Sequence, residues 1–115
     1  MGALEAEILA ALWASDDAMT PAEVRKGIDG NLAYTTVMTI LTRLWEKELA
    51  VREPRGRAYA YRPAMSEAEL VARRLQATLD GAADRSGALS HFVGTLSARD
   101  EQALRAMLTN SDRDR

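Results

Sequence analysis

The chain of 115 residues has no cysteine, one histidine and no long apolar run. Without cysteine it has no disulfide, no thiol redox switch and no cysteine metal site. A single histidine, His91, cannot build a histidine-rich metal site or a histidine-based catalytic relay, so we expect no cofactor or metal. A membrane helix needs about 18 consecutive apolar residues, and neither such a run nor a signal-peptide pattern is present. We therefore expect a cytoplasmic protein that does not insert into membranes.

Acidic and basic residues are unevenly distributed, although the net charge is only −2. Residues 1–20 carry four acids and no base, whereas residues 21–62 carry eight bases against five acids. Residues 63–115 are nearly balanced, with seven bases and eight acids. The basic middle segment is consistent with a nucleic-acid-binding surface, although on charge alone an ordinary mixed surface explains it equally well.

The most informative segment is 33–47, which reads AYTTVMTILTRLWEK. Its apolar residues recur at the spacing of one buried helix face: Val37, Ile40, Leu41 and Leu44. The opposite face carries small hydroxyls flanked by a thioether and a guanidinium: Thr35, Thr39, Thr42, Met38 and Arg43. A solvated helix face usually carries Glu and Lys, whereas these groups suit base edges, thymine methyls and phosphates. The segment therefore predicts a DNA recognition helix.

Two helices are predicted before this segment. Residues 4–14 have the apolar periodicity of the first helix. Thr20-Pro21-Ala22-Glu23 then combines an N-cap residue, a proline at the first helical position and a capping-box glutamate, and the helix that it starts runs to about Ile28. Asp29-Gly30-Asn31 is a turn signal. The order of these elements predicts a helix-turn-helix with one preceding helix.

A β-hairpin is predicted after the recognition helix. Alternating apolar residues at 49–52 and 58–62 flank the segment Glu53-Pro54-Arg55-Gly56-Arg57, which we expect to be the turn. A hairpin in this position is a wing, and Arg55 and Arg57 at its tip would reach a phosphate backbone or a minor groove. We expect the larger aromatic side chains to pack in the core rather than to contact DNA: Trp13, Trp45, Tyr59 and Tyr61.

Beyond Pro63 the sequence predicts helices at about 66–79, 87–96 and 97–110. Such short amphipathic helices cannot bury their apolar stripes alone, so we expect a second copy of the chain to cover them. The fold class is mostly α with a small β-hairpin wing: a winged helix-turn-helix domain in residues 1–63 and a helical dimerisation domain in residues 64–115. The expected dimer contacts are Leu70, Val71, Leu75, Leu89, Phe92, Val93, Leu96, Leu104, Met107 and Leu108.

The segments YTTVMTILTRLWEKE and RGRAYAYRP, in this order after a capped helix, resemble the penicillinase-repressor (BlaI/MecI-type) family of winged-helix regulators. The resemblance implies a homodimeric repressor of β-lactamase or related antibiotic-response genes, bound to a palindromic double-stranded DNA operator. The expected DNA contacts are Tyr34, Thr35, Thr36, Met38, Thr39, Thr42, Arg43, Arg55 and Arg57.

The family resemblance also implies release of the repressor by a membrane sensor protease. The cleaved bond would lie at His91-Phe92, where His91 replaces the asparagine of the family's Asn-Phe site. Glu48 likewise replaces a glycine that many relatives carry after the lysine. Copper-responsive relatives carry paired Cys-x-Cys motifs, which this chain lacks.

Two other functions stay open at this point: a winged-helix module for protein–protein interaction, and a winged-helix regulator that senses a small ligand. An enzyme is not expected, because the sequence contains no nucleophile–base pair, paired-carboxylate setting or phosphate loop.

Overall fold

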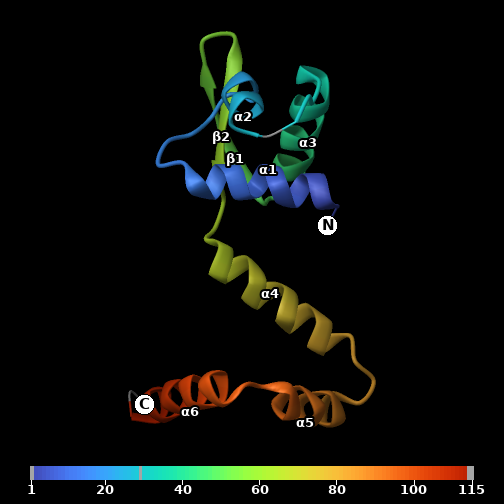
Figure 1. Ribbon diagram of the computed structural model, residues 1–115, viewed down its shortest axis with the longest axis vertical. Helices are drawn as coiled ribbons and strands as arrows, with labels where there is room; N and C mark the ends of the chain where they lie inside the picture. Colours follow the sequence, from blue (N-terminus) through green and yellow to red (C-terminus); the bar gives the residue numbers. More distant parts are fainter. Residues whose placement is uncertain (1, 29, 114–115) are drawn as a thin grey trace. The chain divides into compact units, whose positions relative to one another are not determined.

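The computed structural model describes residues 2–28 and 30–113, so Asp29 of the expected turn lies outside the described residues. The chain divides into two compact units, which we call unit 1 (up to Val71) and unit 2 (from Ala72). Both are drawn in Figure 1. The elements follow in the order α1 (Ala3–Ala14), α2 (Pro21–Gly27), α3 (Tyr34–Glu46), β1 (Ala50–Arg55), β2 (Ala58–Pro63), α4 (Glu67–Asp80), α5 (Arg85–Thr95) and α6 (Ala98–Arg113).

Unit 1 has a hydrophobic core to which α1, α2, α3, the hairpin and the first turn of α4 all contribute. Its buried members are Ile8, Leu9, Leu12, Val24, Ile28, Val37, Ile40, Leu41, Leu44, Ala50, Tyr61 and Leu70. Burying one such aliphatic side chain contributes about 1.5–3 kcal/mol. The four apolar residues predicted for the inner face of α3 are all buried, so the orientation of this helix is confirmed.

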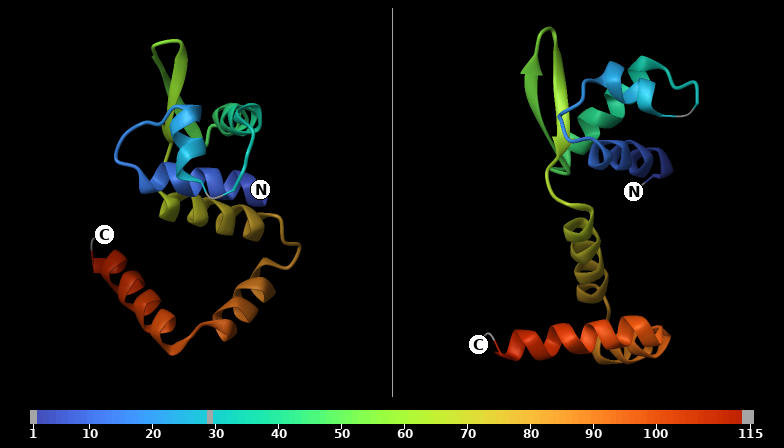
Figure 2. Two further views of the ribbon diagram at one scale, coloured as in Figure 1. Left: turned by 45° about the horizontal axis from the view of Figure 1, so that its top comes forward. Right: turned by 60° about the vertical axis from the view of Figure 1, so that its left-hand side comes forward.

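The hairpin forms the β-structure of unit 1. β1 and β2 pair antiparallel, from Ala50 opposite Pro63 to Arg55 opposite Ala58. Met19 pairs with Tyr61 on the other edge of β2, through N–H···O=C bonds of 2.8 and 2.7 Å. β2 is therefore flanked by β1 on one edge and by Met19 on the other. The tip of the hairpin extends past the helices of the unit (Figures 1 and 2).

The predicted turn was too long. The strands continue through Arg55 and resume at Ala58, which leaves Gly56 and Arg57 as a two-residue turn. Gly56 has φ +62°, which suits glycine at the first central position of a tight hairpin turn. Pro54, taken as a turn residue, lies in β1, where a missing N–H is tolerated because β1 is an edge strand.

The C-terminal end of α3 is fixed by a left-handed residue and an ion pair. Glu48 has φ +64°, and the N–H of Leu49 donates to the Leu44 carbonyl at 2.9 Å, as in a Schellman motif. This position usually carries glycine, because a side chain is disfavoured there. Lys47 Nζ lies 3.0 Å from the buried carboxylate of Glu5, which joins this end of α3 to α1.

Two helix boundaries differ from the prediction. α5 begins at Arg85 rather than near Gly87, because the Asp84 side chain caps it by accepting from the Gly87 N–H at 2.9 Å. α6 extends to Arg113 rather than stopping near Asn110, since the sequence has no glycine or proline there to end it. Ser97 caps this helix: the Asp100 N–H donates to Ser97 Oγ at 3.1 Å.

Unit 2 consists of the rest of α4 with α5 and α6 (Figure 2). None of the side chains described from Ala72 to Asn110 is buried. Leu79 and Leu96 are half-buried, and the other large apolar side chains are exposed: Leu75, Leu89, Phe92, Val93, Leu104, Met107 and Leu108. Unit 2 therefore has amphipathic helices without a core of its own within one chain.

Candidate nucleic-acid interface

The side chains on the outer face of α3 take no part in the hydrophobic core. Thr35, Met38 and Thr39 are exposed, Met38 by 42%, while the opposite side of the same helix is fully buried. A shallow hollow on this face is lined by Met38, Thr39, Thr42, Arg43 and Glu46. Core packing thus fixes which side chains α3 presents outward, and these are the hydroxyls and the thioether that the sequence singled out.

Two of the threonine hydroxyls are already used as donors within the helix. Thr39 Oγ1 donates to the Thr35 carbonyl at 2.8 Å, and Thr42 Oγ1 donates to the Met38 carbonyl at 2.9 Å. Each hydroxyl oxygen keeps lone pairs with which it can accept, and each side chain keeps its methyl group. The face is therefore suited to amino-group donors and methyl groups on a partner.

The entry into α3 is held by α2 and its capping box. Thr20 Oγ1 accepts from the Glu23 N–H at 3.3 Å, and the Glu23 carboxylate accepts from the Thr20 N–H at 3.0 Å. The bond from the Thr20 N–H, followed by one from the Thr20 hydroxyl to Glu23 Oε1 at 3.0 Å, holds the pKa of Glu23 below its ordinary value. Arg25 Nε donates to the Leu32 carbonyl at 2.8 Å, which fastens the segment before α3 to α2. The capping box predicted from the sequence is confirmed.

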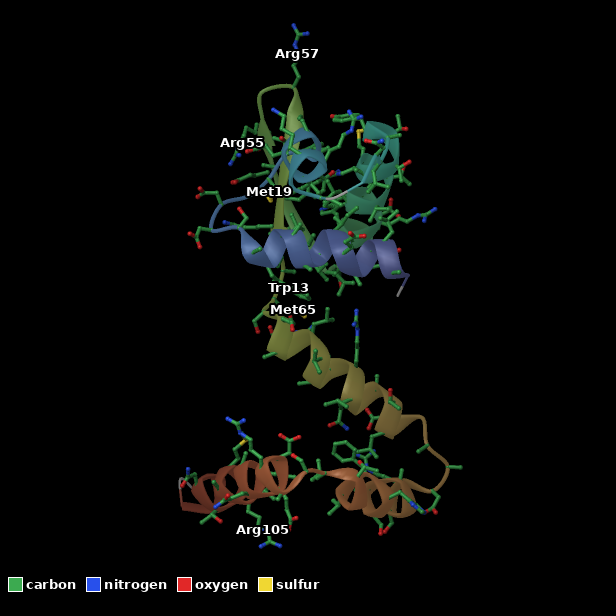
Figure 3. All side chains as sticks on the ribbon, viewed as in Figure 1. Trp13, Met19, Arg55, Arg57, Met65 and Arg105 are labelled. Atoms are coloured by element: carbon green, nitrogen blue, oxygen red, sulfur yellow. The ribbon has the colours of Figure 1, made fainter. Side chains whose placement is uncertain are left out.

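The two arginines expected at the wing tip have different surroundings. Arg57 lies in the turn and points away from the unit (Figure 3). Arg55 Nη1 instead donates to the Ala18 carbonyl at 3.0 Å and lies 3.6 Å from Glu23 Oε1. Arg55 therefore ties the wing to the segment before α2, whereas Arg57 is presented to a partner.

Trp45 and Tyr59 do not pack in the core, contrary to expectation. Trp45 is 40% exposed and Tyr59 44% exposed, and the guanidinium of Arg52 lies over both rings. Tyr61 is buried as expected. The difference arises because Tyr61 lies where β2 meets α1 and Met19, whereas Tyr59 lies closer to the free tip.

Trp13 is half-buried against the core, and its indole N–H donates to the Met65 carbonyl at 2.9 Å. Trp13 lies on α1 and Met65 just before α4, and the two residues are side by side (Figure 3). This bond holds the segment between β2 and α4 against α1.

The structure brings the residues predicted to contact DNA together in unit 1. Seven lie on α3, where Thr36 and Thr42 are half-buried and the others exposed, and two lie on the hairpin. Arg52 was not among the predicted contacts, and its position against Trp45 and Tyr59 depends on the pairing of β1 with β2. The one sequence feature that could have drawn attention to it is an arginine within the alternating residues of the first predicted strand.

The residues predicted to form a dimer are distributed over both units. Leu70 is only 5% exposed and contributes to the core of unit 1. Val71 is exposed at the end of unit 1, and in unit 2 Leu96 is half-buried while the other seven are exposed. His91 and Phe92 are exposed within α5.

Neither a metal site nor a membrane span is found in the part of the chain that the structure describes. Its His, Asp and Glu side chains nowhere gather in threes or more in a way that could hold an ion. Among residues 2–28 and 30–113, each helix is too short or too polar to cross a bilayer.

Comparisons with known proteins agree with this geometry. The model of the penicillinase repressor family matches residues 1–110. The transcriptional regulator BlaI of Mycobacterium tuberculosis is 37% identical over 113 residues, which cover 94% of this chain and 82% of that protein.

Solved structures show the same fold at low identity. MepR, a transcription regulator of the Staphylococcus aureus multidrug efflux pump MepA, has a TM-score of 0.54 at 20% identity over 99% of this chain and 79% of that chain. A MepR mutant bound to an oligodeoxyribonucleotide has a TM-score of 0.53 at 18% identity over the same shares. A mutant of MarR from E. coli has 0.52 at 17% identity over 96% of this chain and 77% of that one. The predicted fold class is confirmed.

Proposed function

Since the chain belongs to the penicillinase repressor family, we propose that it is a transcriptional repressor that binds a palindromic DNA operator as a homodimer. The observation that carries the proposal is the outer face of α3, where Met38, Thr39 and Arg43 are exposed on a helix whose other side is buried. Such a repressor acts in the cytoplasm, where the DNA is.

The chemistry of this face suits the major groove of B-DNA. The major groove admits an α-helix and displays adenine and cytosine amino groups as donors and thymine methyls as apolar contacts. Thr39 and Thr42 hydroxyls, whose protons already donate within the helix, can accept from those amino groups. Met38 would contact thymine methyls, and Arg43 a phosphate or a guanine.

A second copy of this chain is the partner that we propose for unit 2. Its exposed leucines, Phe92 and Val93 recur on amphipathic helices and lack a core within one chain. Pairing of two such sets by a two-fold axis would bury them and would place two α3 helices about 34–36 Å apart, one turn of DNA. The dimerisation domain proposed from the sequence, 64–115, therefore also includes residues 64–71, which belong to unit 1.

In this proposal a sensor protease cuts the chain at His91-Phe92, and the cut releases the repressor from its operator. Phe92 shares α5 with Leu89 and Val93, so cleavage there would separate part of a small interface from α6. A foreign protease site placed at residues 90–92 tests this: complete cleavage should empty a bound operator. Occupancy that survives complete cleavage would show that release works differently, for example through a bound ligand.

Footprinting of the purified full chain on genomic DNA upstream of its own gene tests the proposed function. We expect two protected half-sites with inverted symmetry, centred one helical turn apart. A scrambled fragment of equal length is the control. The absence of protection on every promoter fragment would favour the protein-docking alternative, and a single protected half-site would contradict the dimer.

A further inference from the structure

Arg52 of β1 is half-buried in a stack with two exposed aromatic side chains that lie outside the core of unit 1. Its Cζ atom lies 3.6 Å from the ring centroid of Trp45 and 4.1 Å from that of Tyr59. Trp45 comes from the end of α3 and Tyr59 from β2, so the stack joins the helix to the wing. Two large aromatic side chains that remain exposed around one cation need an explanation other than burial.

The stack holds a flat guanidinium in a defined orientation. Aromatic rings contact the face of a guanidinium, so its N–H groups stay available in its plane. Arg52 Nη1 donates to Tyr61 Oη at 3.4 Å, and the remaining donors of the fork have no bond to a described residue in the structure. A guanidinium held in this way is suited to bind a phosphate through parallel hydrogen bonds, with little loss of side-chain entropy.

The position of Arg52 lies between the two surfaces proposed to contact DNA. Trp45 follows Met38 by seven residues, which places it two turns, about 10 Å, along nearly the same side of α3. In the other direction, β1 leads from Arg52 to the turn that carries Arg57. If α3 occupied the major groove and the wing reached the next groove, the sugar–phosphate backbone between the grooves would pass over this junction.

We infer that Arg52 binds a backbone phosphate of the operator, and that Trp45 and Tyr59 are positioning residues for its guanidinium. The inference rests on the proposed function. A purely structural stack that joins the wing to α3 is the competing explanation. The two differ in one measurable quantity, because only a bound phosphate releases a counterion and adds to the salt dependence of binding.

The test is the slope of log affinity against log salt for the full chain on operator and on scrambled duplex. Arg52→Gln should lower the slope by about 1 and weaken binding to both duplexes equally. Arg52→Met, whose apolar chain fits between rings, should do the same. Arg52→Lys should keep the slope at reduced affinity, because the charge remains and the planar stack is lost.

Arg62→Gln is the matched control, since Arg62 lies on the opposite face of the hairpin and the change removes the same charge. It should leave the slope unchanged. For the positioning role, Trp45→Leu should weaken binding at an unchanged slope, and the loss caused by Arg52→Gln should be smaller in that background.

A folded Arg52→Gln or Arg52→Met protein with the wild-type slope would overturn the inference while the proposed function stands. An equal loss from Arg62→Gln would also overturn it, because the effect would then be one of overall charge. If the wild-type chain shows no salt-dependent binding to any duplex, the proposed function fails and this inference fails with it.

Discussion

Unit 1 and unit 2 bury their apolar side chains to opposite extents. Unit 1 encloses aliphatic side chains from every one of its elements, whereas each side chain described from Ala72 to Asn110 is at least partly exposed. Helical periodicity is present in both, so amphipathic pattern alone does not make a unit that is stable by itself. The difference is consistent with the tasks proposed for the two units, in which unit 1 presents α3 to DNA as a folded body and a second copy of the chain completes the core of unit 2.

The largest expected effect comes from a charge placed in unit 2. Leu104→Asp should give a monomer, because a carboxylate cannot be buried unpaired in an apolar interface. Operator affinity should fall by about 10²–10⁴-fold as the linked second half-site is lost. Sedimentation gives the mass and a gel-shift titration the affinity.

Gln102→Asp adds the same charge on the other side of α6 and is the control for this change. It should remain dimeric with nearly wild-type affinity. A Leu104→Asp protein of dimer mass would show that the dimer interface does not include this face of α6.

Shortening one apolar side chain in each unit tests whether unit 1 has a complete core and unit 2 an incomplete one. In the monomeric Leu104→Asp background, Leu44→Ala should lower the free energy of unfolding of unit 1 by about 2–5 kcal/mol, since Leu44 is fully buried. Leu75→Ala, at a side chain 57% exposed, should change it by less than about 0.5 kcal/mol. Urea denaturation measures both, and equal effects would show that the units share one core.

The sequence predicted α3 and the capping box well, because both depend on residues close together in the chain. The contacts of Arg55 and Arg52 could not be predicted, since they depend on hairpin register and on which segment lies beside the wing. The Met19–Tyr61 pairing escaped for the same reason: residues 15–20 show no strand pattern. Leu70 was assigned to a dimer stripe, although the structure uses it to close the core of unit 1; whether it also contacts a partner stays a prediction.

Within unit 1, substitutions at the proposed base contacts and at the proposed phosphate contacts should affect DNA binding differently. Met38→Ala or Thr39→Ala should reduce the preference for operator over scrambled DNA by about 1–3 kcal/mol. Arg57→Ala should weaken binding to both duplexes alike, because it removes only a phosphate contact. Competition binding at fixed salt decides this, and an unchanged preference in both α3 variants would show that α3 does not read the bases.

A small gain in stability is expected at the left-handed residue that ends α3. Glu48→Gly should raise the free energy of unfolding of unit 1 by about 0.5–1 kcal/mol, because glycine adopts positive φ without steric strain. The dimer mass and the operator affinity should not change. Denaturation of the Leu104→Asp monomer with and without Glu48→Gly measures the gain, and a loss of stability would mean that the Glu48 side chain stabilises this end of the helix.

Amide hydrogen exchange, resolved by residue, tests most directly whether unit 1 is complete and unit 2 is not. In the proposed wild-type dimer we expect protected amides in α1, α3, α5 and α6. In the Leu104→Asp monomer, α1 and α3 should keep their protection while α5 and α6 lose theirs. Unchanged protection of α5 and α6 in a proven monomer would show that unit 2 is stable without a partner, and loss of protection in α3 together with them would show that unit 1 is not stable by itself.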